Sequence, residues 1–465
     1  MHKLTRRLAA FGVVTVLFAA IAGSATAHEF SGLTTTAGGY HTWDSDQVNI
    51  EKVTETGKGV YVAVLDTGLA PNYQDYFPAA RVRTDLGTGF DQPVNFTAGA
   101  DGCQLTTEVG KLSQTTWVGS TGSTHGTHVA STILGYFYDA PADDSFKALP
   151  PIVVRGIAPD VTLIPVKVLA DYQVPARPNC DDPDQNTAAH GIVFGTDGMV
   201  AAGIDYVTGL AKKGIKPIAI NMSLGDTVPA QVIEDAIDRA IAAGVIVVAS
   251  AGNNGEEGMG WPGAYSQVIS AGASGWTREW LNPATGLPSY RLWWLKDGGA
   301  LGLPTGSGDV ADPTSADDVY VTDFSSREYA GQDLDVLAPG SWVRGPFPGT
   351  PGYRHLPWYS QGISGIGNFF YVGGTSMAAP HVTSAAAMLL QKNPTLKQAQ
   401  VESILESTAL RIPSHGDPTV YDLSPTAGFY VKEWDTDCDG TRCDPVGSGL
   451  LQVDAALAAV SSAKK

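Results

Sequence analysis

Short, unbroken apolar runs alternate with amphipathic segments along most of the chain, and the two patterns predict different elements. The apolar runs lie at residues 60–65, 161–169, 218–222 and 245–249. Runs of this length are typical of parallel strands that are buried on both faces. The amphipathic segments follow residue 125, span 199–212, and run from Pro229 to Gly244. This alternation predicts a three-layer α/β fold with a mainly parallel central sheet and helices on both faces.

Four stretches interrupt the alternation. They are rich in Gly, Pro, Asp and aromatic residues, and they span residues 95–122, 171–190, 277–322 and 344–371. Because apolar elements resume after each stretch, we expect long loops inserted into one domain. The stretches carry, among other aromatic residues, Trp280, Trp293, Trp294 and Trp358. We expect these rings to form small hydrophobic clusters under the loops, and the alternative is that they border a binding cleft.

The first residues have the character of an export signal. A basic start precedes an apolar run at residues 8–21, and Ala-Thr-Ala at 25–27 matches a signal-peptidase site. The run is short for a bilayer span, and no later stretch is long and apolar enough to be one. We therefore predict a signal peptide at 1–27 and a single secreted domain at 28–465, without a membrane anchor after cleavage.

Composition narrows the range of partners. The chain has 47 acidic and 29 basic residues, for a net charge of -18, so nucleic acid and anionic membranes are unsuitable partners. With 43% hydrophobic residues it can build a large core. We expect it to be a monomer.

Four cysteines suggest two disulfides in an exported chain, with three possible connectivities. The close spacing of Cys438 and Cys443 favours a local bridge between them. Cys103 would then pair with Cys180.

Three short segments contain the residue types of nucleophilic catalysis. They are Val-Leu-Asp-Thr-Gly at 64–68, His-Gly-Thr-His-Val-Ala at 125–130 and Gly-Thr-Ser-Met-Ala-Ala-Pro-His at 374–381. In this order they resemble the signature blocks of the subtilisin-like serine peptidases, the subtilase family. Weaker similarity runs from about residue 43 to 449–456. The resemblance implies a subtilisin-like fold and a catalytic triad of Asp66, His125 and Ser376.

The chemistry of these residues agrees with the resemblance. Ser376 precedes a predicted helix at 377–391, so its hydroxyl lies in the positive field of unpaired amide groups. A serine hydroxyl needs a neighbouring base to take its proton, which is the role expected of His125. Asp66 ends a predicted buried strand, where its carboxylate can orient the imidazole and stabilise its charged form.

Two other hydrolase classes do not fit the segments. Aspartic proteases pair two Asp-Thr-Gly-type motifs, and this chain has one. Esterases of the α/β-hydrolase class use G-x-S-x-G in the order Ser, Asp, His, whereas Ser376 lies in G-T-S-M-A and comes last. We predict a secreted serine endopeptidase that cleaves protein or peptide substrates through an acyl-enzyme. The alternative is a catalytically silent, secreted peptide-binding relative with an occluded cleft.

The resemblance also implies an oxyanion hole. Asn253 lies in Ala-Gly-Asn-Asn-Gly, after a predicted strand. It matches the family asparagine whose side chain binds the developing oxyanion, assisted by the backbone N–H of Ser376.

Substrate binding is implied by the same resemblance. The residues that it assigns are Ser223, Leu224, Gly225, Gly252 and Gly260. The first three match an edge strand that pairs with an extended peptide. The two later glycines would leave the first specificity pocket open to a large apolar side chain, whereas Glu256 and Glu257 would favour a basic one. The preference stays open.

Metal binding and maturation depart from the family pattern. Asp435, Asp437 and Asp439 alternate like calcium ligands but lack the Glu of a regular EF-hand loop, so a solvated loop held by a disulfide is the favoured interpretation and calcium the alternative. The chemistry itself requires no cofactor.

Fewer than 40 residues separate the predicted cleavage site from the catalytic strand, which leaves no room for the usual inhibitory pro-domain. We expect His128 and His381 to be packed structural residues.

Overall fold

A computed structural model describes most of the chain. The described residues are 30, 32–99, 102–120, 124–139, 151–177, 188–281, 285–288, 295, 315–348, 369–422 and 428–460. The described residues from 33 to 460 belong to one compact unit. The signal peptide predicted at 1–27 lies outside the described residues.

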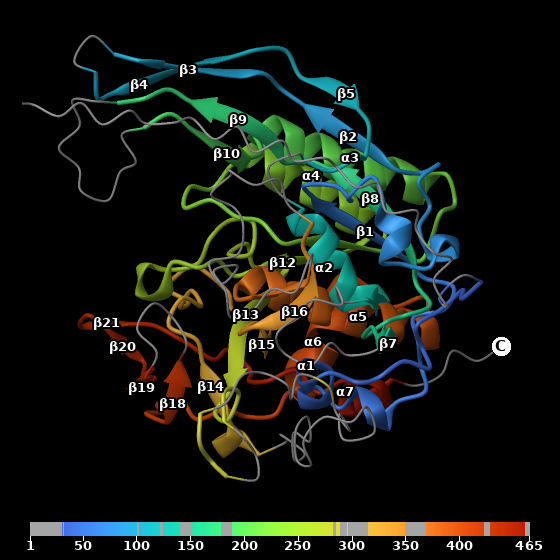
Figure 1. Cartoon of the computed structure of the whole chain (residues 1–465), viewed down its shortest axis with the longest axis vertical. Helices are drawn as coiled ribbons and strands as arrows, with labels where there is room; N and C mark the ends of the chain where they lie inside the picture. Colours follow the sequence, from blue (N-terminus) through green and yellow to red (C-terminus); the bar gives the residue numbers. More distant parts are fainter. Residues whose placement is uncertain are drawn as a thin grey trace, which may run out of the picture. The chain divides into compact units, whose positions relative to one another are not determined.

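A nine-stranded sheet forms the centre of this compact unit (Figure 1). Eight of its strands follow the order β14 (Val319–Val321), β13 (Ile269–Trp276), β12 (Ile246–Ser250), β11 (Ile218–Met222), β1 (Tyr61–Asp66), β8 (Thr162–Lys167), β2 (Thr88–Asp91) and β5 (Ser113–Thr115), and β15 (Val336–Pro339) also pairs with β13. The pairings are parallel except those of β13 with β14 and of β2 with β5. The mainly parallel sheet expected from the apolar runs is therefore confirmed.

Helices cover both faces of this sheet. They are α1 (Trp43–Gln47), α2 (His125–Leu134), α3 (Asp197–Lys212), α4 (Gln231–Ala242), α5 (Thr375–Lys392), α6 (Gln398–Thr408) and α7 (Val453–Ala459). Side chains in a strand alternate between faces, so Val62 and Val64 of β1 pack in one core with α2 and α5, whereas Ala63 and Leu65 pack in another with α3 and α4. Both faces of β1 are buried, which explains why its sequence is an unbroken apolar run.

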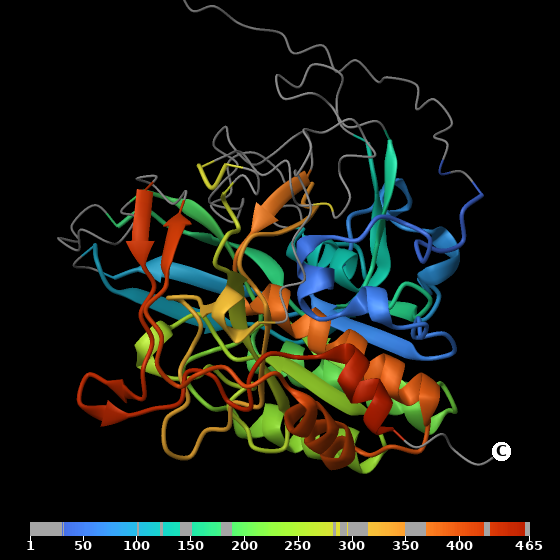
Figure 2. The ribbon, with the colours of Figure 1, turned by 90° about the horizontal axis from the view of Figure 1, so that it is seen from below.

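The predicted inserts contain more strands than expected. The described strands outside the main sheet form hairpins: β3 (Val94–Ala98) with β4 (Leu105–Val109), β6 (Gly135–Tyr138) with β7 (Ile152–Arg155), β9 (Ala170–Val174) with β10 (His190–Phe194), β16 (Val343–Pro346) with β17 (Phe369–Val372), β18 (Thr419–Asp422) with β19 (Gly428–Val431), and β20 (Asp437–Cys438) with β21 (Thr441–Arg442). The prediction of loops at 95–122 and 171–190 misses β3, β4, β5, β9 and the start of β10, and the later inserts contain β14 and parts of β16 and β17. The residues of β3, β4 and β10 are largely exposed or half-buried, whereas β9 alternates buried with less buried residues, so none of these four strands has the unbroken apolar run of a strand buried on both faces. Figure 1 shows β3 and β4 beside β9, and Figure 2 shows the C-terminal hairpins in red.

Trp280 belongs to the main core, not to a satellite cluster. It is 2% exposed, and its ring centroid lies 5.2 Å from that of Trp342 in an edge-to-face arrangement. Trp293, Trp294 and Trp358 lie outside the described residues.

The topology brings several strand ends together. β1, β11 and β12 are parallel neighbours, so their carboxyl ends lie on the same edge of the sheet. Asp66 ends β1, Ser223 follows β11, and Asn253 follows β12 by three residues. Residues far apart in the sequence therefore share one edge.

Among the described residues, no helix combines the length and the apolar character needed to cross a bilayer.

Candidate active site

The carboxylate of Asp66 and the imidazole of His125 form a close pair. Asp66 is fully buried at the end of β1, and His125 is the first residue of α2. His125 Nδ1 lies 2.9 Å from each carboxylate oxygen of Asp66. A Cβ at Gly126 would lie 2.5 Å from the carbonyl oxygen of Gly68, so α2 approaches β1 this closely only because residue 126 is a glycine.

The environment of His125 changes its pKa in two opposite ways. Burial lowers the pKa, whereas the negative charge of Asp66 and the hydrogen bond to it raise the pKa. The net effect is a pKa above the usual 6.5. The pair can thus stabilise an imidazolium that forms when His125 accepts a proton.

Ser376 lies in the first turn of α5 and contacts Ser223, which lines a cavity together with His125. Its Oγ donates a hydrogen bond to the carbonyl oxygen of Ser223 at 3.3 Å. Within the described part of the chain, His125 is not the hydrogen-bond partner of this hydroxyl. Catalytic hydrogen bonds are often long or unformed before substrate binds, so this arrangement is compatible with a Ser–His relay.

Pro380 and Ser223 explain how the first turn of α5 is held. Pro380 lies inside α5 and has no N–H, so it cannot donate to the carbonyl of Ser376 four residues earlier. The hydroxyl of Ser223 donates to that carbonyl instead, at 2.7 Å. The side chain of Asn221 in turn donates to Ser223 Oγ at 3.0 Å. The sequence analysis assigns Ser223 only to the edge strand that pairs with substrate. Its second role, as donor to the carbonyl of Ser376, is indicated in the sequence by the proline four residues after Ser376.

The side chain of Asn253 has a fixed orientation. Its Oδ1 accepts hydrogen bonds from the backbone N–H and the hydroxyl of Thr375, both at 2.9 Å. Because an N–H can only donate, the carbonyl end of the amide must face Thr375, and the NH2 end is the one left for another acceptor. Asn253 is exposed and lies next to Ser376 in space through Thr375.

A cavity of about 400 Å³ lies beside His125 and Ser223. Its walls include His125, Ser223, Leu224 and Gly225, together with apolar side chains from several elements such as Phe347. Its described lining is mostly apolar, and the acidic residues in it are Asp197 and Asp226.

The place of the two later glycines in the first specificity pocket stays a prediction. Within the described part of the chain, Gly252 and Gly260 are not among the residues that line this cavity. They lie against each other: a Cβ at Gly252 would lie 2.9 Å from the backbone nitrogen of Gly260. Their small size allows two backbone segments to approach.

Two further histidines near the site are buried within the protein. His128 Nε2 lies 3.1 Å from the carbonyl oxygen of Val343, and burial, with the nearby charge of His125, lowers the pKa of His128 to about 3. His381 Nε2 lies 3.1 Å from a carboxylate oxygen of Asp44. Both side chains are fully buried.

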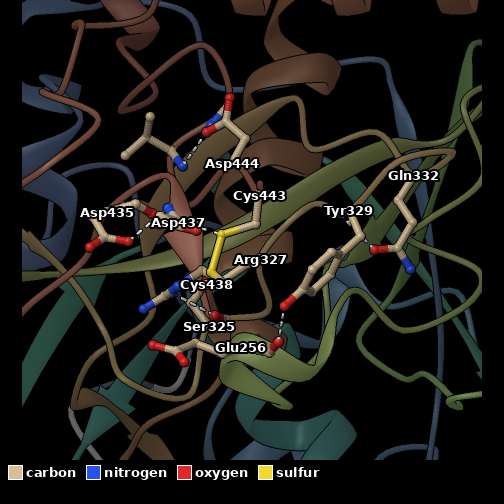
Figure 3. Close-up of a disulfide and its surroundings, with 12 residues drawn as sticks. Glu256, Ser325, Arg327, Tyr329, Gln332, Asp435, Asp437, Cys438, Cys443 and Asp444 are labelled. Atoms are coloured by element: carbon tan, nitrogen blue, oxygen red, sulfur yellow. Dashed lines mark hydrogen bonds between the residues drawn. A yellow bond between two sulfur atoms is a disulfide. The ribbon is translucent and has the colours of Figure 1, made fainter. Parts of the chain in front are cut away.

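The C-terminal cysteine loop has the predicted local disulfide. Cys438 and Cys443 are bonded to each other in the β20–β21 hairpin (Figure 3). Cys180 lies outside the described residues, so its pairing with Cys103 stays a prediction.

The carboxylates of this loop do not converge on one point. Asp435 Oδ1 accepts a hydrogen bond from the backbone N–H of Asp437 at 2.8 Å. In the described parts of the chain, no group of three or more His, Cys, Asp or Glu side chains is close enough to hold a metal ion.

A mainly parallel α/β sheet with a buried aspartate–histidine pair at its edge, and a serine at the start of a helix that contacts the same edge through Ser223, is compatible with a serine hydrolase. The family model of the subtilase family matches residues 57–433, and the chain belongs to this family. It is therefore a serine-type endopeptidase that acts on proteins, and family members need no cofactor for this reaction.

Known relatives agree with this assignment. Subtilisin DY of Bacillus licheniformis is 27% identical over 369 residues, which cover 78% of this chain and 88% of the relative. A subtilisin of Bacillus pumilus is 28% identical over 76% of this chain and 85% of the relative. Among solved structures, the S41 psychrophilic protease matches with a TM-score of 0.50 at 22% identity, over 90% of this chain and 99% of that one, which supports the fold.

Proposed function

We propose that Asp66, His125 and Ser376 form the catalytic triad of a secreted endopeptidase. Ser376 Oγ attacks the carbonyl carbon of the scissile peptide bond while His125 Nε2 takes the hydroxyl proton. His125 then gives this proton to the leaving amine, and an acyl-enzyme on Ser376 remains. A water molecule, activated by the same imidazole, hydrolyses the acyl-enzyme. Asp66 holds Nδ1 throughout and stabilises the imidazolium.

The observation that carries this proposal is the contact of His125 Nδ1 with both oxygens of the fully buried Asp66, at 2.9 Å. A histidine held through Nδ1 presents Nε2 as the reacting nitrogen. The raised pKa of His125 is compatible with a general base that accepts a proton near neutral pH.

The oxyanion hole consists of the side-chain NH2 of Asn253 and the backbone N–H of Ser376. Support comes from the hydrogen bonds of Thr375 to Asn253 Oδ1, which leave the NH2 group available. Among the described residues, no group accepts a hydrogen bond from the N–H of Ser376 at the start of α5. Two such donors stabilise the negative charge that develops on the substrate oxygen.

An extended peptide substrate binds along Ser223, Leu224 and Gly225, which line the cavity beside His125. Backbone pairing to this segment would hold the peptide in register, and the apolar cavity would take a side chain. Secretion is supported by the basic start, apolar run and Ala-Thr-Ala at residues 1–27.

A casein digestion assay tests the proposal. The wild type should degrade casein, a serine-directed inhibitor should abolish the activity, and Ser376→Ala should reduce it to background. Ser384→Ala is a matched control, because Ser384 is a fully buried serine on the same helix and no described group bonds its hydroxyl. This control should keep the activity. Peptide binding without cleavage in the wild type would instead identify a catalytically silent relative, and inhibitor-resistant cleavage would refute the triad.

A further inference from the structure

The loop at residues 252–259, called here the oxyanion loop, is bonded to Ser326 on both sides of Asn253. The N–H of Ser326 donates to the carbonyl oxygen of Gly252 at 3.0 Å. The N–H of Asn254 donates to Ser326 Oγ at 3.0 Å. Ser326 is fully buried and belongs to the segment between β14 and β15, which is distant in sequence. One residue thus brackets Asn253 with a backbone bond before it and a side-chain bond after it.

Neighbours of Ser326 bond the rest of the oxyanion loop. Gly255 donates through its N–H to the carbonyl oxygen of Phe324 at 3.0 Å and accepts from the N–H of Arg327 at 2.9 Å. The hydroxyl of Tyr329 donates to the carbonyl oxygen of Glu256 at 2.6 Å (Figure 3). The segment at 324–329 therefore runs alongside the oxyanion loop and is hydrogen-bonded to it, but neither segment forms a regular β-strand.

The close approach of the two segments requires a glycine. Gly252 has a φ of +105°, and a Cβ there would lie 2.9 Å from Ser326 Oγ. Any larger residue at 252 would separate Ser326 from the loop.

The segment is itself anchored from its far side. The guanidinium of Arg327 is almost fully buried and donates to the carbonyl oxygens of Ser325, at 2.6 Å, and Thr322, at 3.2 Å. Glu328 and Asp444 exchange two backbone hydrogen bonds, of 2.8 and 2.9 Å, and Asp444 directly follows Cys443 of the disulfide. Ser326 therefore lies in a buried segment fixed by several hydrogen bonds, whereas Asn253 is exposed to solvent.

We propose that Ser326 is a positioning residue of the reaction, which acts through Asn253 by fixing the backbone on both sides of it. An oxyanion donor is effective only if it is already in place when the charge develops. Thr375 orients the amide group of Asn253 and also accepts from the N–H of Gly252 at 3.2 Å. Ser326 bonds the loop backbone both before and after Asn253, so it fixes the position of the Asn253 Cα from both sides. This inference rests on the oxyanion role of Asn253 proposed above.

A double-mutant cycle tests the inference. Four enzymes are compared on a peptide p-nitroanilide chosen from the casein cleavage sites: wild type, Ser326→Ala, Asn253→Ala and the double variant. Ser326→Ala should lower kcat about 3- to 10-fold and leave KM within about twofold, because one hydrogen bond that orients a transition-state donor is lost. Asn253→Ala should lower kcat about 100- to 1,000-fold, a range established for subtilisin itself rather than calculated from this chain. In the Asn253→Ala background, the Ser326 substitution should have no further effect on kcat.

Ser325→Ala is the matched control. Ser325 is equally buried and adjacent, but its Oγ accepts from the backbone of Ala273 on β13 instead of the oxyanion loop. Its loss should lower the melting temperature without a selective loss of kcat. If Ser326→Ala does not fold, Ser326→Cys replaces it, because a thiol has similar size and is a weak acceptor.

The outcomes separate the two proposals. Full kcat in the Ser326 variant, together with a large loss in Asn253→Ala, would overturn the positioning role alone. An equal loss from Ser326→Ala in both backgrounds, or an equal loss of kcat in Ser325→Ala, would also overturn it, since both indicate a general structural effect. Wild-type kcat in Asn253→Ala would overturn the oxyanion assignment and this inference with it.

Discussion

His125 has a buried carboxylate on one side and an open cavity on the other, and this environment determines how it titrates. The imidazole is 23% exposed, whereas Asp66 is fully buried. Burial, the largest single effect, would lower the pKa of His125, but the charge of Asp66 and the hydrogen bond to it together outweigh burial, and the pKa is raised. The neutral imidazole needed to accept the Ser376 proton is therefore present only above this raised pKa.

The pH dependence of kcat/KM should show this directly. We expect activity to fall on acidification with an apparent pKa above 6.5 in the free enzyme, measured between about pH 5 and about pH 9. Asp66→Asn should lower kcat about 10,000-fold, because the imidazole loses both its orientation and its stabilising charge. An acid limb centred below 6.5 in the wild type would contradict the coupling of His125 to Asp66.

At the scale of elements, α1 is joined to the helix that carries Ser376. His381 of α5 lies one turn beyond the nucleophile, and its two ring nitrogens contact Met377 O at 2.8 Å and Asp44 at 3.1 Å. Asp44 is 5% exposed. A short N-terminal helix thus contacts the catalytic helix through a buried polar pair.

Asp44→Ala should lower the free energy of unfolding by about 1–3 kcal/mol, because it leaves Nε2 of the buried imidazole without its partner. The measurement is denaturant unfolding at neutral pH. Asp75→Ala, at an exposed position, is the control and should change stability by less than about 0.5 kcal/mol. Equal stability of the two variants would show that the pair does not hold α1 to α5.

The disulfide of the β20–β21 hairpin is a second stabilising element. It joins residues that are 5 apart in sequence, so its loop-closure effect on the unfolded chain is small. Replacing both Cys438 and Cys443 by serine should lower the free energy of unfolding by about 2 kcal/mol. Denaturant unfolding of the variant and of the wild type, both without reductant, measures this difference. A loss of more than about 5 kcal/mol would mean that the hairpin is needed for the fold to form.

At the scale of the molecule, the buried half of the structure was predictable from the sequence and the exposed half was not. β1, β11 and α5 follow from apolar runs and motifs that belong to single segments. The β3–β4 hairpin was missed because its residues are half-buried or exposed, so burial leaves no continuous apolar pattern. Asp44 and His381 are in contact but 337 residues apart in sequence, and no local sequence pattern predicts such a contact.

Some residues of the candidate site were predictable from local sequence motifs and others were not. Three local motifs predict Asp66, His125 and Ser376, because each lies at the end of a strand or the start of a helix. Ser326 could not be found from the sequence, since its two bonds to the oxyanion loop depend on how distant segments pack.

Stability should depend on pH through a group of acidic residues around α6. Burial, with the charges of Glu406 and Asp333, raises the pKa of Glu402 to about 7. The folded protein then holds this proton more tightly than the unfolded chain, so this contribution to stability is complete below about pH 4.5 and is lost as pH rises through about 7. Glu402→Gln should therefore raise the melting temperature at about pH 8 but not at about pH 4. Glu108→Gln, which removes the same charge from an exposed strand, should raise it at neither pH, and an equal gain in both variants would point to net charge alone.

The central claim is that Ser376 is the nucleophile, and covalent labelling tests it most directly. The enzyme is treated with a fluorophosphonate, digested and analysed by mass spectrometry to identify the modified residue. The account predicts a single adduct on Ser376, formed in parallel with loss of activity and absent after denaturation or in Ser376→Ala. An adduct on another residue, or full activity with Ser376 labelled, would contradict it.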